Sequence, residues 1–405
     1  FIPINFTIFC IEAQGLIEVN AFIDENENGS FDVDEINFSE GVFTYEVNND
    51  GNISYINSSY GNFLIPILNE GDSYDISFIM YDGYNSCLTQ PFTLIEDVTA
   101  AVGETVQVDF PVAPLANCND IAVYLTSVVP PRPGQLDNMS LVIENLGSVS
   151  VSGSVEFTHD PLLSVFDVLY LDAGNSITNT ATGFILDFVD LLPGAQEAVT
   201  ILLNVPVSAM AGEYVTNSAV YSENDIDLDN NESILTEVIV NSYDPNNKLE
   251  SHGPEIDLND FTDEDYLFYT INFQNLGTAE AIDVRVEDFL DAQLDVSTFK
   301  MLFASHDYVL TRMNDHLVWE FENINLPSES MDPPNSTGFV YFKIKPLPGY
   351  AEGDVIPNVA DIYFDFNPAI TTNIFETEFV ASLSVDEFAI SQFALYPNPA
   401  NDIVN

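Results

Sequence analysis

Apolar and polar residues alternate with a period of two along many short segments of this chain. Three clear cases are residues 151–157, 283–289 and 339–344, all rich in β-branched and aromatic side chains. Turn sequences such as Asn49-Asp50-Gly51 and Leu192-Pro193-Gly194 interrupt these segments at short intervals. No window carries a long helical period. The pattern therefore predicts an all-β chain of several β-sandwiches.

Two short motifs recur in the same order in the second and third parts of the chain. The sequence at 144–147 (Glu-Asn-Leu-Gly) returns at 274–277 (Gln-Asn-Leu-Gly), each time after an alternating strand. The second motif begins at Gly212 and again at Gly353. In both places an acidic residue follows the glycine directly, Asn stands five residues after the glycine, and Ala stands seven residues after it. The repeated order predicts a shared fold. We expect a signal-peptide remnant over 1–15, a different sandwich over 16–116, related sandwiches over 119–242 and 243–380, and a linker with the start of a further domain over 381–405.

The two ends of the chain carry features of export. Residues 1–10 form an apolar run that is too short to span a bilayer, and Ala13 follows as a small residue. This is typical of the back half of a secretory signal peptide, although a first strand of the mature fold is an alternative. Removal of Cys10 would leave Cys87 and Cys118, which an oxidising compartment could join; two unpaired thiols are the alternative.

The composition limits the partners of the chain. Among 405 residues there are 65 Asp+Glu and only 7 Lys+Arg, for a formal charge of -58, yet 46% of residues are hydrophobic. Such apolar content excludes an acidic disordered tail. Binding to nucleic acid or anionic membranes needs clustered Lys and Arg, so neither is expected. The surface should instead attract cations.

One acidic segment has the spacing of a calcium loop. Residues 24–35 place oxygen ligands at loop positions 1, 3, 5, 9 and 12, with Gly29 at position 6 for the sharp turn. Ca²⁺ prefers six to eight oxygen ligands, so this alternation predicts a Ca²⁺ site. Because the flanks have a strand pattern, the loop would belong to a β-module; an acidic surface turn is the alternative. The expected ligands are the side chains of Asp24, Asn26 and Asn28, the carbonyl of Ser30, Asp32 directly or through water, and Glu35.

A second acidic cluster carries a weaker prediction. Asp225, Asp227 and Asp229 place three carboxylates on one side of an extended segment. A bound cation would relieve their repulsion, and a solvated hairpin tip explains the pattern equally well.

Motifs of the common enzyme classes are absent from the sequence. There is no His-Glu-x-x-His, no Gly-x-Ser-x-Gly and no phosphate-binding glycine loop. The four histidines are scattered, and the Ser-x-x-Lys spacing at 297–300 has no companion motif. We therefore predict that the chain is not an enzyme.

Segments in three parts of the chain resemble known families. The sequences at 243–248, 269–278 and 358–367 resemble a family of Ig-like repeats of unknown function in secreted bacterial proteins. Residues 393–402 resemble the start of the type A sorting domain of type IX secretion in Bacteroidota. The loop at 24–35 resembles the Ca²⁺-binding B-type repeats of adhesins of the serine-aspartate-repeat kind. These resemblances imply Ig-like or prealbumin-like sandwiches and export through the type IX secretion machinery.

Together these features predict a non-enzymatic, secreted or outer cell-surface protein. It would serve as a Ca²⁺-stiffened stalk or an adhesin-like module, with an unidentified surface glycan or protein as its ligand and no membrane span. The alternative is the accessory C-terminal region of a secreted hydrolase whose catalytic domain lies outside this sequence. Recovery of the upstream coding sequence would decide between the two.

Overall fold

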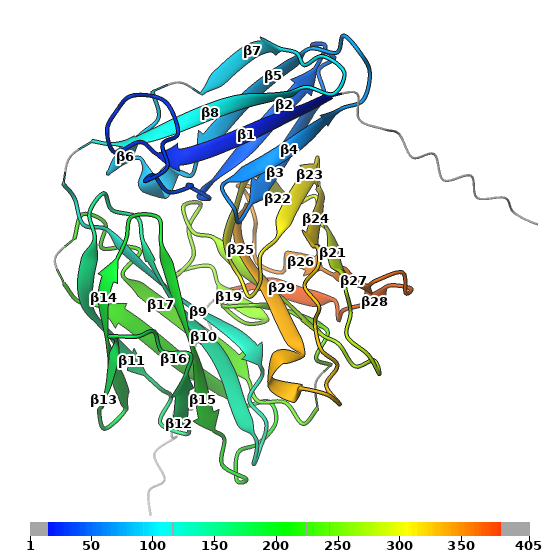
Figure 1. Ribbon diagram of the computed structural model, residues 1–405. Helices are drawn as coiled ribbons and strands as arrows, with labels where there is room; N and C mark the ends of the chain where they lie inside the picture. The colour runs from blue at the N-terminus through cyan, green and yellow to red at the C-terminus, as the bar shows by residue number, and fades with distance from the viewer. Residues whose placement is uncertain (1–14, 92, 116, 224, 243, 382–405) are drawn as a thin grey trace, which may run out of the picture.

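The computed structural model describes residues 15–381, except 92, 116, 224 and 243. Its elements are strands, apart from two single-turn 3-10 helices. The strands form three groups, at residues 15–114, 121–238 and 247–380, which we call the first, second and third groups (Figure 1). The prediction of an all-β chain of sandwiches is confirmed. The predicted sorting-domain start lies outside the described residues, and so does the predicted signal-peptide remnant, with Cys10, except for Gly15, which begins β1.

The first group is a sandwich of two sheet layers. One layer has the order β4-β1-β8-β6, in which β1 runs parallel to β8, and the other has the order β3-β2-β5-β7. Alternate residues of β1 and β5, such as Ile17, Val19 and Phe78, are buried between the layers. The elements are β1 (Gly15–Ile23), β2 (Gly41–Val47), β3 (Ile53–Ser58), β4 (Asn62–Ile67), β5 (Tyr74–Met80), η1 (Asp82–Tyr84), β6 (Leu88–Thr89), β7 (Leu94–Val98) and β8 (Thr105–Pro114).

The second group is an antiparallel sandwich. Its layers have the orders β12-β15-β10-β9 and β13-β14-β11-β16-β17. Side chains such as Ile143, Phe157 and Phe184 fill the space between them. The strands are β9 (Ile121–Val129), β10 (Leu136–Asn145), β11 (Val151–Thr158), β12 (Ser164–Leu169), β13 (Ser176–Asn179), β14 (Gly183–Leu191), β15 (Gln196–Asn204), β16 (Tyr214–Tyr221) and β17 (Glu232–Val238).

The third group packs around Trp319, the single tryptophan of the chain, which is fully buried. The sheet β18-β20-β25-β22 faces β28-β27-β21-β24-β23, and the small sheet β19-β29-β26 lies beside them. The elements are β18 (Asn247–Glu250), β19 (Glu255–Asp257), β20 (Leu267–Gln274), β21 (Val284–Phe289), β22 (Leu294–Ala304), β23 (Val309–Met313), β24 (His316–Phe321), η2 (Pro333–Asn335), β25 (Thr337–Pro346), β26 (Val355–Asn358), β27 (Ala360–Phe364), β28 (Ile370–Thr371) and β29 (Phe375–Val380).

The sequence repeat corresponds to a repeated structure. Asn145, at the end of β10, donates to the carbonyls of Val149 and Leu191 and accepts from the Gly147 amide. Asn275, directly after β20, makes the same three bonds, donating to Ala279 and Leu326 and accepting from Gly277. β10 of the second group therefore corresponds to β20 of the third.

The strand registers extend this equivalence. In the second group Leu125 of β9 lies opposite Leu141 of β10, and in the third group Lys248 of β18 lies opposite Ile271 of β20. On the other layer, Phe157 of β11 lies opposite Ala219, and Asp288 of β21 lies opposite Ala360. Lys248 and Asp288 therefore take the places that Leu125 and Phe157 hold in the second group.

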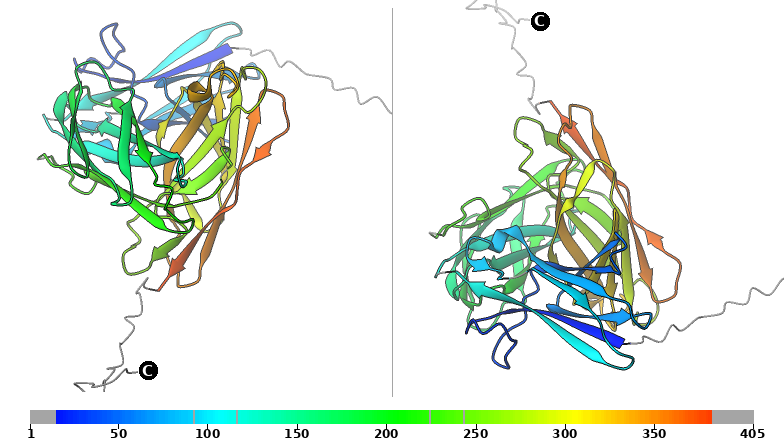
Figure 2. Two further views of the ribbon diagram at one scale, coloured as in Figure 1. Left: turned by 90° about the horizontal axis from the view of Figure 1, so that it is seen from below. Right: turned by 90° about the horizontal axis from the view of Figure 1, so that it is seen from above.

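The three groups pack around a common centre instead of following one another in a row (Figures 1 and 2). Residues 55–58 of β3 pair with residues 309–312 of β23, so one sheet of nine strands runs from β28 in the third group to β7 in the first. Tyr84 of the first group donates to Glu144 of the second, at 2.6 Å. Gln196 of the second group donates to the Leu302 carbonyl of the third, at 2.8 Å. The described residues thus form a three-cornered body, not the extended row of modules that a stalk requires.

Candidate metal site

The acidic loop at 24–35 begins directly after β1 and is closed at its base. The Ile23 amide donates to the Ile36 carbonyl at 3.0 Å, and Phe22 forms an isolated bridge with Asn37. The ring of Phe31 packs against that of Phe22, with 5.2 Å between centroids. The two ends of the loop are therefore held together by backbone bonds and an aromatic contact, while most of its polar side chains, Asp24 excepted, stay at or near the surface.

The first half of the loop wraps around the Asp24 carboxylate. Asp24 is buried, and its Oδ1 and Oδ2 accept the backbone amides of Asn28 at 3.1 Å and Gly29 at 2.8 Å. Gly29 has a φ of 76°, a conformation that a residue with a Cβ adopts only with strain. The glycine at loop position 6 is therefore required by the turn that brings its own amide to Asp24.

The other expected side-chain ligands approach one another. The amide groups of Asn26 and Asn28 donate to Asp32 Oδ2 at 2.9 and 2.7 Å, and these bonds lower the pKa of the Asp32 carboxyl. Glu35 Oε2 accepts the Asp32 amide at 2.9 Å, while Glu35 Oε1 is buried without a hydrogen-bond partner. The structure thus brings together Asp24, Asn26, Asn28, Asp32 and Glu35. Ser30 joins the same turn through its amide, which donates to Asn28 Oδ1 at 2.7 Å.

The donor set fits a hard cation chemically. Each expected ligand offers oxygen, and the two Asn amide groups point their nitrogens at Asp32 in the position where a cation would compete. Rotation of each amide by half a turn would replace nitrogen by oxygen in the same place. In the part of the chain that the structure describes, no three His, Cys, Asp or Glu side chains are arranged to hold a metal ion. A site at this loop therefore depends on the asparagine oxygens and on that rotation.

The weaker cluster lies in the connection between β16 and β17, where the carboxylates of Asp225 and Asp227 accept backbone amides. Asp225 accepts the amides of Ile121 at 2.9 Å and of Asp227 at 3.2 Å, and Asp227 accepts the amide of Asp229 at 3.1 Å. The three carboxylates therefore follow one another along the turn and attach it to the start of β9. These contacts explain why an acidic turn is stable here without requiring a bound ion.

Cys87 and Cys118 form a disulfide, with their Cα atoms 5.8 Å apart. Cys87 follows the helix η1 in the first group, and Cys118 precedes β9, so the bond joins the first group to the second. Of the two alternatives that the sequence left open, the disulfide is confirmed.

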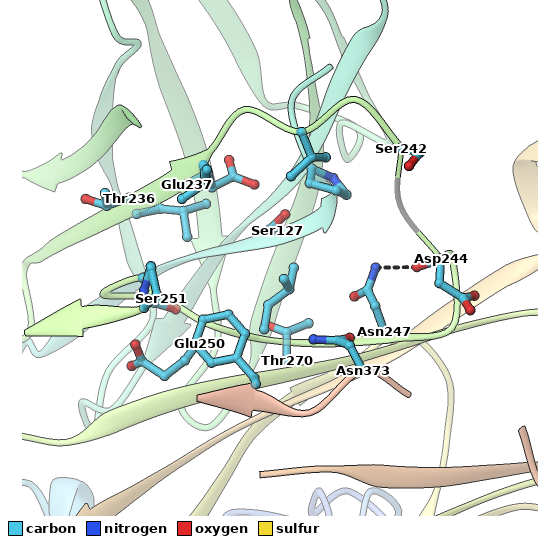
Figure 3. A pocket seen from close by; sticks show the side chains of 18 residues that line it. Ser127, Thr236, Glu237, Ser242, Asp244, Asn247, Glu250, Ser251, Thr270 and Asn373 are labelled. Carbon is cyan, nitrogen blue, oxygen red and sulfur yellow. Dashed lines mark hydrogen bonds between the residues drawn. The ribbon is translucent and has the colours of Figure 1, made fainter. Parts of the chain in front are cut away.

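A cavity of 370 Å³ lies between the second and third groups, and no sequence motif marks it. Figure 3 shows Glu237 and Ser127 on one wall, with Asp244, Asn247 and Asn373 on another. Burial raises the pKa of the Glu237 carboxyl to about 7, although the Ser127 hydroxyl lowers it. A carboxyl whose pKa burial raises far above that of a solvated glutamate therefore lies at this junction.

A second carboxyl, that of Asp137, lies near Glu237. Asp137 is fully buried, and burial together with the charge of Glu237 raises its pKa well above the ordinary value. All four oxygens of the two carboxyls are buried without a hydrogen-bond partner. Single acids within strands, such as these, cannot be distinguished by sequence from the many solvated acids of this chain.

The fold and the loop define an all-β protein of packed sandwiches with an oxygen-rich surface loop. Within it, residues 244–378 match the family model described as a domain of unknown function (DUF7619). This match covers most of the third group. No curated protein matches the chain.

Solved structures of bacterial surface proteins superpose only loosely on the chain. The collagen adhesin (CNA) from S. aureus has 11% identity and a TM-score of 0.25, covering 65% of this chain and 93% of its own. BcpA, the major pilin subunit of Bacillus cereus, has 12% identity and a TM-score of 0.26, covering 91% and 97%. The pilus backbone (RrgB) from Streptococcus pneumoniae has 11% identity and a TM-score of 0.20, and the match covers 65% of this chain and 100% of the pilus protein. Likenesses at these scores carry no inference about the function of this chain.

No helix in residues 15–381, leaving aside the four residues not described, is long and apolar enough to cross a membrane.

Proposed function

We propose that this chain is a non-enzymatic protein of the outer cell surface or the secreted fraction, whose first group binds Ca²⁺ through the loop at 24–35. The observation that carries the calcium site is the convergence of Asp24, Asn26, Asn28 and Asp32 within one closed loop. Bound Ca²⁺ would replace hydrogen bonds between these side chains by stronger contacts to oxygen, and so would stiffen the connection from β1 to β2.

The disulfide supports an extracellular location. Disulfides persist in oxidising compartments and are rare in the cytosol. The bond between Cys87 and Cys118 joins two sandwich groups, so its loss would loosen the contact between them. The high negative charge suits a protein that stays in solution among other surface molecules.

The shape favours the adhesin-like alternative over the stalk. Because β3 and β23 share a sheet, the first and third groups cannot extend away from each other without breaking strand pairs. A three-cornered body of this kind suits a globular head that presents a surface to a glycan or protein ligand. In this proposal the domains are residues 16–116, 119–242 and 243–380. The chain is exported by the type IX machinery, which recognises the sorting domain that begins with the sequence at 393–402.

Calcium binding is tested by titrating the chelator-treated full chain with Ca²⁺ in a calorimeter and by following its melting temperature. Ca²⁺ should raise the melting temperature, because it binds the folded loop and not the unfolded chain. Asp32→Asn, which removes an exposed ligand charge, should abolish the shift, as should Asp24→Ala. Asp34→Ala is the matched control, since Asp34 lies in the same loop and outside the ligand set; it should keep the full shift.

A heat of binding that Asp32→Asn leaves unchanged would place the ion elsewhere. A melting curve of the wild-type chain that responds to neither EDTA nor Ca²⁺ would show that the loop is a surface turn. Trapping of free thiols on protein recovered from the culture medium or cell surface tests the location: Cys87 and Cys118 should be unreactive until a reductant is added.

A further inference from the structure

Lys248 and Asp288 form an ion pair that is completely buried in the third group. Lys248 Nζ donates to Asp288 Oδ2, and both side chains have 0% exposure. The Nζ atom lies 5.1 Å from the ring centroid of Tyr269 and 5.5 Å from that of Phe342. The amine and the carboxyl therefore meet in a dry cage with aromatic walls.

Asn358 belongs to the same interior. It is 2% exposed, and neither its Oδ1 nor its Nδ2 has a hydrogen-bond partner, although a buried carboxamide normally binds at both ends. Asp288 lies opposite Ala360, and Asn358 comes two residues before Ala360 with its side chain also in the core. Asn358 is the last residue of β26 in the small neighbouring sheet, directly beyond the end of the β21–β27 pairing.

The Tyr269 ring connects the three side chains. Burial, with the charges of Glu250 and Asp288, raises the pKa of Tyr269, whereas the approach of the Thr377 and Asn358 side chains to its hydroxyl lowers it. Lys248 Nζ lies over the face of the same ring. The amine, the carboxyl and the unpartnered carboxamide thus surround one aromatic side chain.

A second asparagine beside Lys248, Asn373, has hydrogen-bond partners at both ends of its carboxamide. Asn373 accepts the Lys248 amide with its Oδ1 at 2.9 Å and donates from its Nδ2 to the Lys248 carbonyl at 3.0 Å. Both ends of its carboxamide are therefore engaged with backbone. This clamp also fixes the position of Lys248 on β18.

The second group shows that the fold does not need the buried charges. It has Leu125 where the third group has Lys248, Phe157 where it has Asp288, and Asn217 where it has Asn358. Replacing a buried ion pair by apolar side chains is often neutral or stabilising, so stability alone does not account for this one.

The cage favours the uncharged forms of both partners. Burial lowers the pKa of the Lys248 amine to about 8 and raises the pKa of the Asp288 carboxyl, although each partner opposes the shift of the other. A neutral amine is a nucleophile, and a protonated carboxyl can supply and take back a proton.

We propose that Lys248 and Asn358 become joined by an amide bond, with Asp288 as the proton shuttle. Lys248 Nζ attacks Cγ of Asn358, so an Nζ–Cγ bond forms and the Cγ–Nδ2 bond breaks. Of the two amine hydrogens, one stays on the new amide nitrogen and the other passes through Asp288 to Nδ2, which leaves as ammonia. Asp288 ends in its starting protonation state, and no oxidant or cofactor is needed.

The bond would fasten the first strand of the third group to one of its last. It spans 358 − 248 = 110 positions of the sequence and links β18 to β26 across the core. A pulling force on the two ends of this group would then act on a covalent bridge instead of on strand hydrogen bonds. This inference does not depend on the calcium site.

The test is the mass of the purified full chain, measured after denaturation and reduction of the disulfide. The expected mass is lower than the sequence mass by one ammonia, and a digest should contain a branched peptide that joins the segments with Lys248 and Asn358. Peptide mapping is essential, because ring closure at Asn28-Gly29 would also release ammonia. Lys248→Arg, which keeps a positive charge, and Asp288→Asn, which removes the shuttle, should both restore the sequence mass.

The mass of the wild-type chain decides the matter even where a variant fails to fold. A wild-type mass equal to the sequence mass means that the three side chains form only a buried ion pair, and the proposal fails. A mass lower by one water would make a carboxyl the acceptor, which overturns the assignment to Asn358. An ammonia loss that persists in Lys248→Arg would place the reaction outside this cage.

Discussion

The second and third groups share one frame but bury different chemistry within it. Asn145 and Asn275 make the same three hydrogen bonds, so the frame around them is the same. At equivalent core positions the second group has Leu125 and Phe157, and the third has Lys248 and Asp288. These strands therefore fold with apolar side chains at these positions, so the charged pair in the third group serves something other than folding.

The two groups also bury charge in opposite ways. The third group pairs an amine with a carboxyl, whereas the second places the carboxyls of Asp137 and Glu237 near each other at its junction with the third. Opposite charges are held together by attraction, while like charges are tolerated only when a proton neutralises one of them. The stability of the chain should therefore fall when either partner of the opposite-charge pair in the third group is removed. It should change with pH because of the two neighbouring carboxyls in the second group.

The largest expected effect follows from breaking the buried pair. Asp288→Ala should lower the free energy of unfolding by about 3–5 kcal/mol, because it leaves the Lys248 charge without a partner in the core. The double variant Lys248→Leu with Asp288→Phe, which copies the second group, should lose less. Urea unfolding followed by the fluorescence of Trp319, which lies in the core of the third group, measures both. If the double variant loses more than Asp288→Ala, the equivalence of the two cores is wrong.

A smaller effect should appear on changing the pH. The pKa of Glu237 is raised from 4.5 to about 7 in the folded chain, so the folded state binds its proton more tightly than the unfolded state. The stability that this proton contributes is complete below pH 4.5 and is lost as the pH rises through 7, by up to about 3 kcal/mol. Glu237→Gln should flatten this part of the profile of unfolding free energy against pH.

Glu232→Gln is the matched control for the pH experiment, since Glu232 is exposed on the same strand. It changes the net charge equally and should leave the slope between pH 4.5 and 7 as it is in the wild-type chain. An equal flattening in both variants would mean that general charge repulsion, and not the buried carboxyl, governs the profile.

The smallest expected effect tests the shared frame itself. Asn145→Ala and Asn275→Ala each remove three hydrogen bonds, two of them to carbonyls that would be left without this donor. Each should lower stability by about 2–3 kcal/mol, measured by scanning calorimetry. Clearly unequal losses would show that the two asparagines do not hold equivalent positions.

Much of this architecture could be predicted from the sequence because its signals are local. The alternating segments at 151–157 and 339–344 lie in β11 and β25, and the segment at 283–289 lies in β21 except for its first residue, since alternation depends only on which face of a strand is buried. The loop at 24–35 brings its side chains together because Gly29 and the spacing fix a short turn. The repeated Asn-Leu-Gly sequence identified equivalent strand ends for the same reason.

Long-range contacts could not be predicted in this way. The pairing of β3 with β23 joins segments about 250 positions apart, and neither strand shows by its own pattern which edge it will meet. Lys248 lies in a strand of four residues, too short for a periodic signal, and only the fold shows that Asp288 and Asn358 lie in the same interior. The carboxyls of Asp137 and Glu237 were missed because nothing local separates a buried acid from 63 other Asp and Glu residues (65 − 2).

The most direct measurement is a peptide map of the reduced, denatured full chain. Because Lys248 and Asp288 are what distinguishes the third group from the second, we expect one branched peptide that joins Lys248 to Asn358. The peptide containing Asn217, the equivalent asparagine of the second group, should be linear. Linear peptides at both asparagines, with the whole chain at its sequence mass, would mean that Lys248 and Asn358 are not joined.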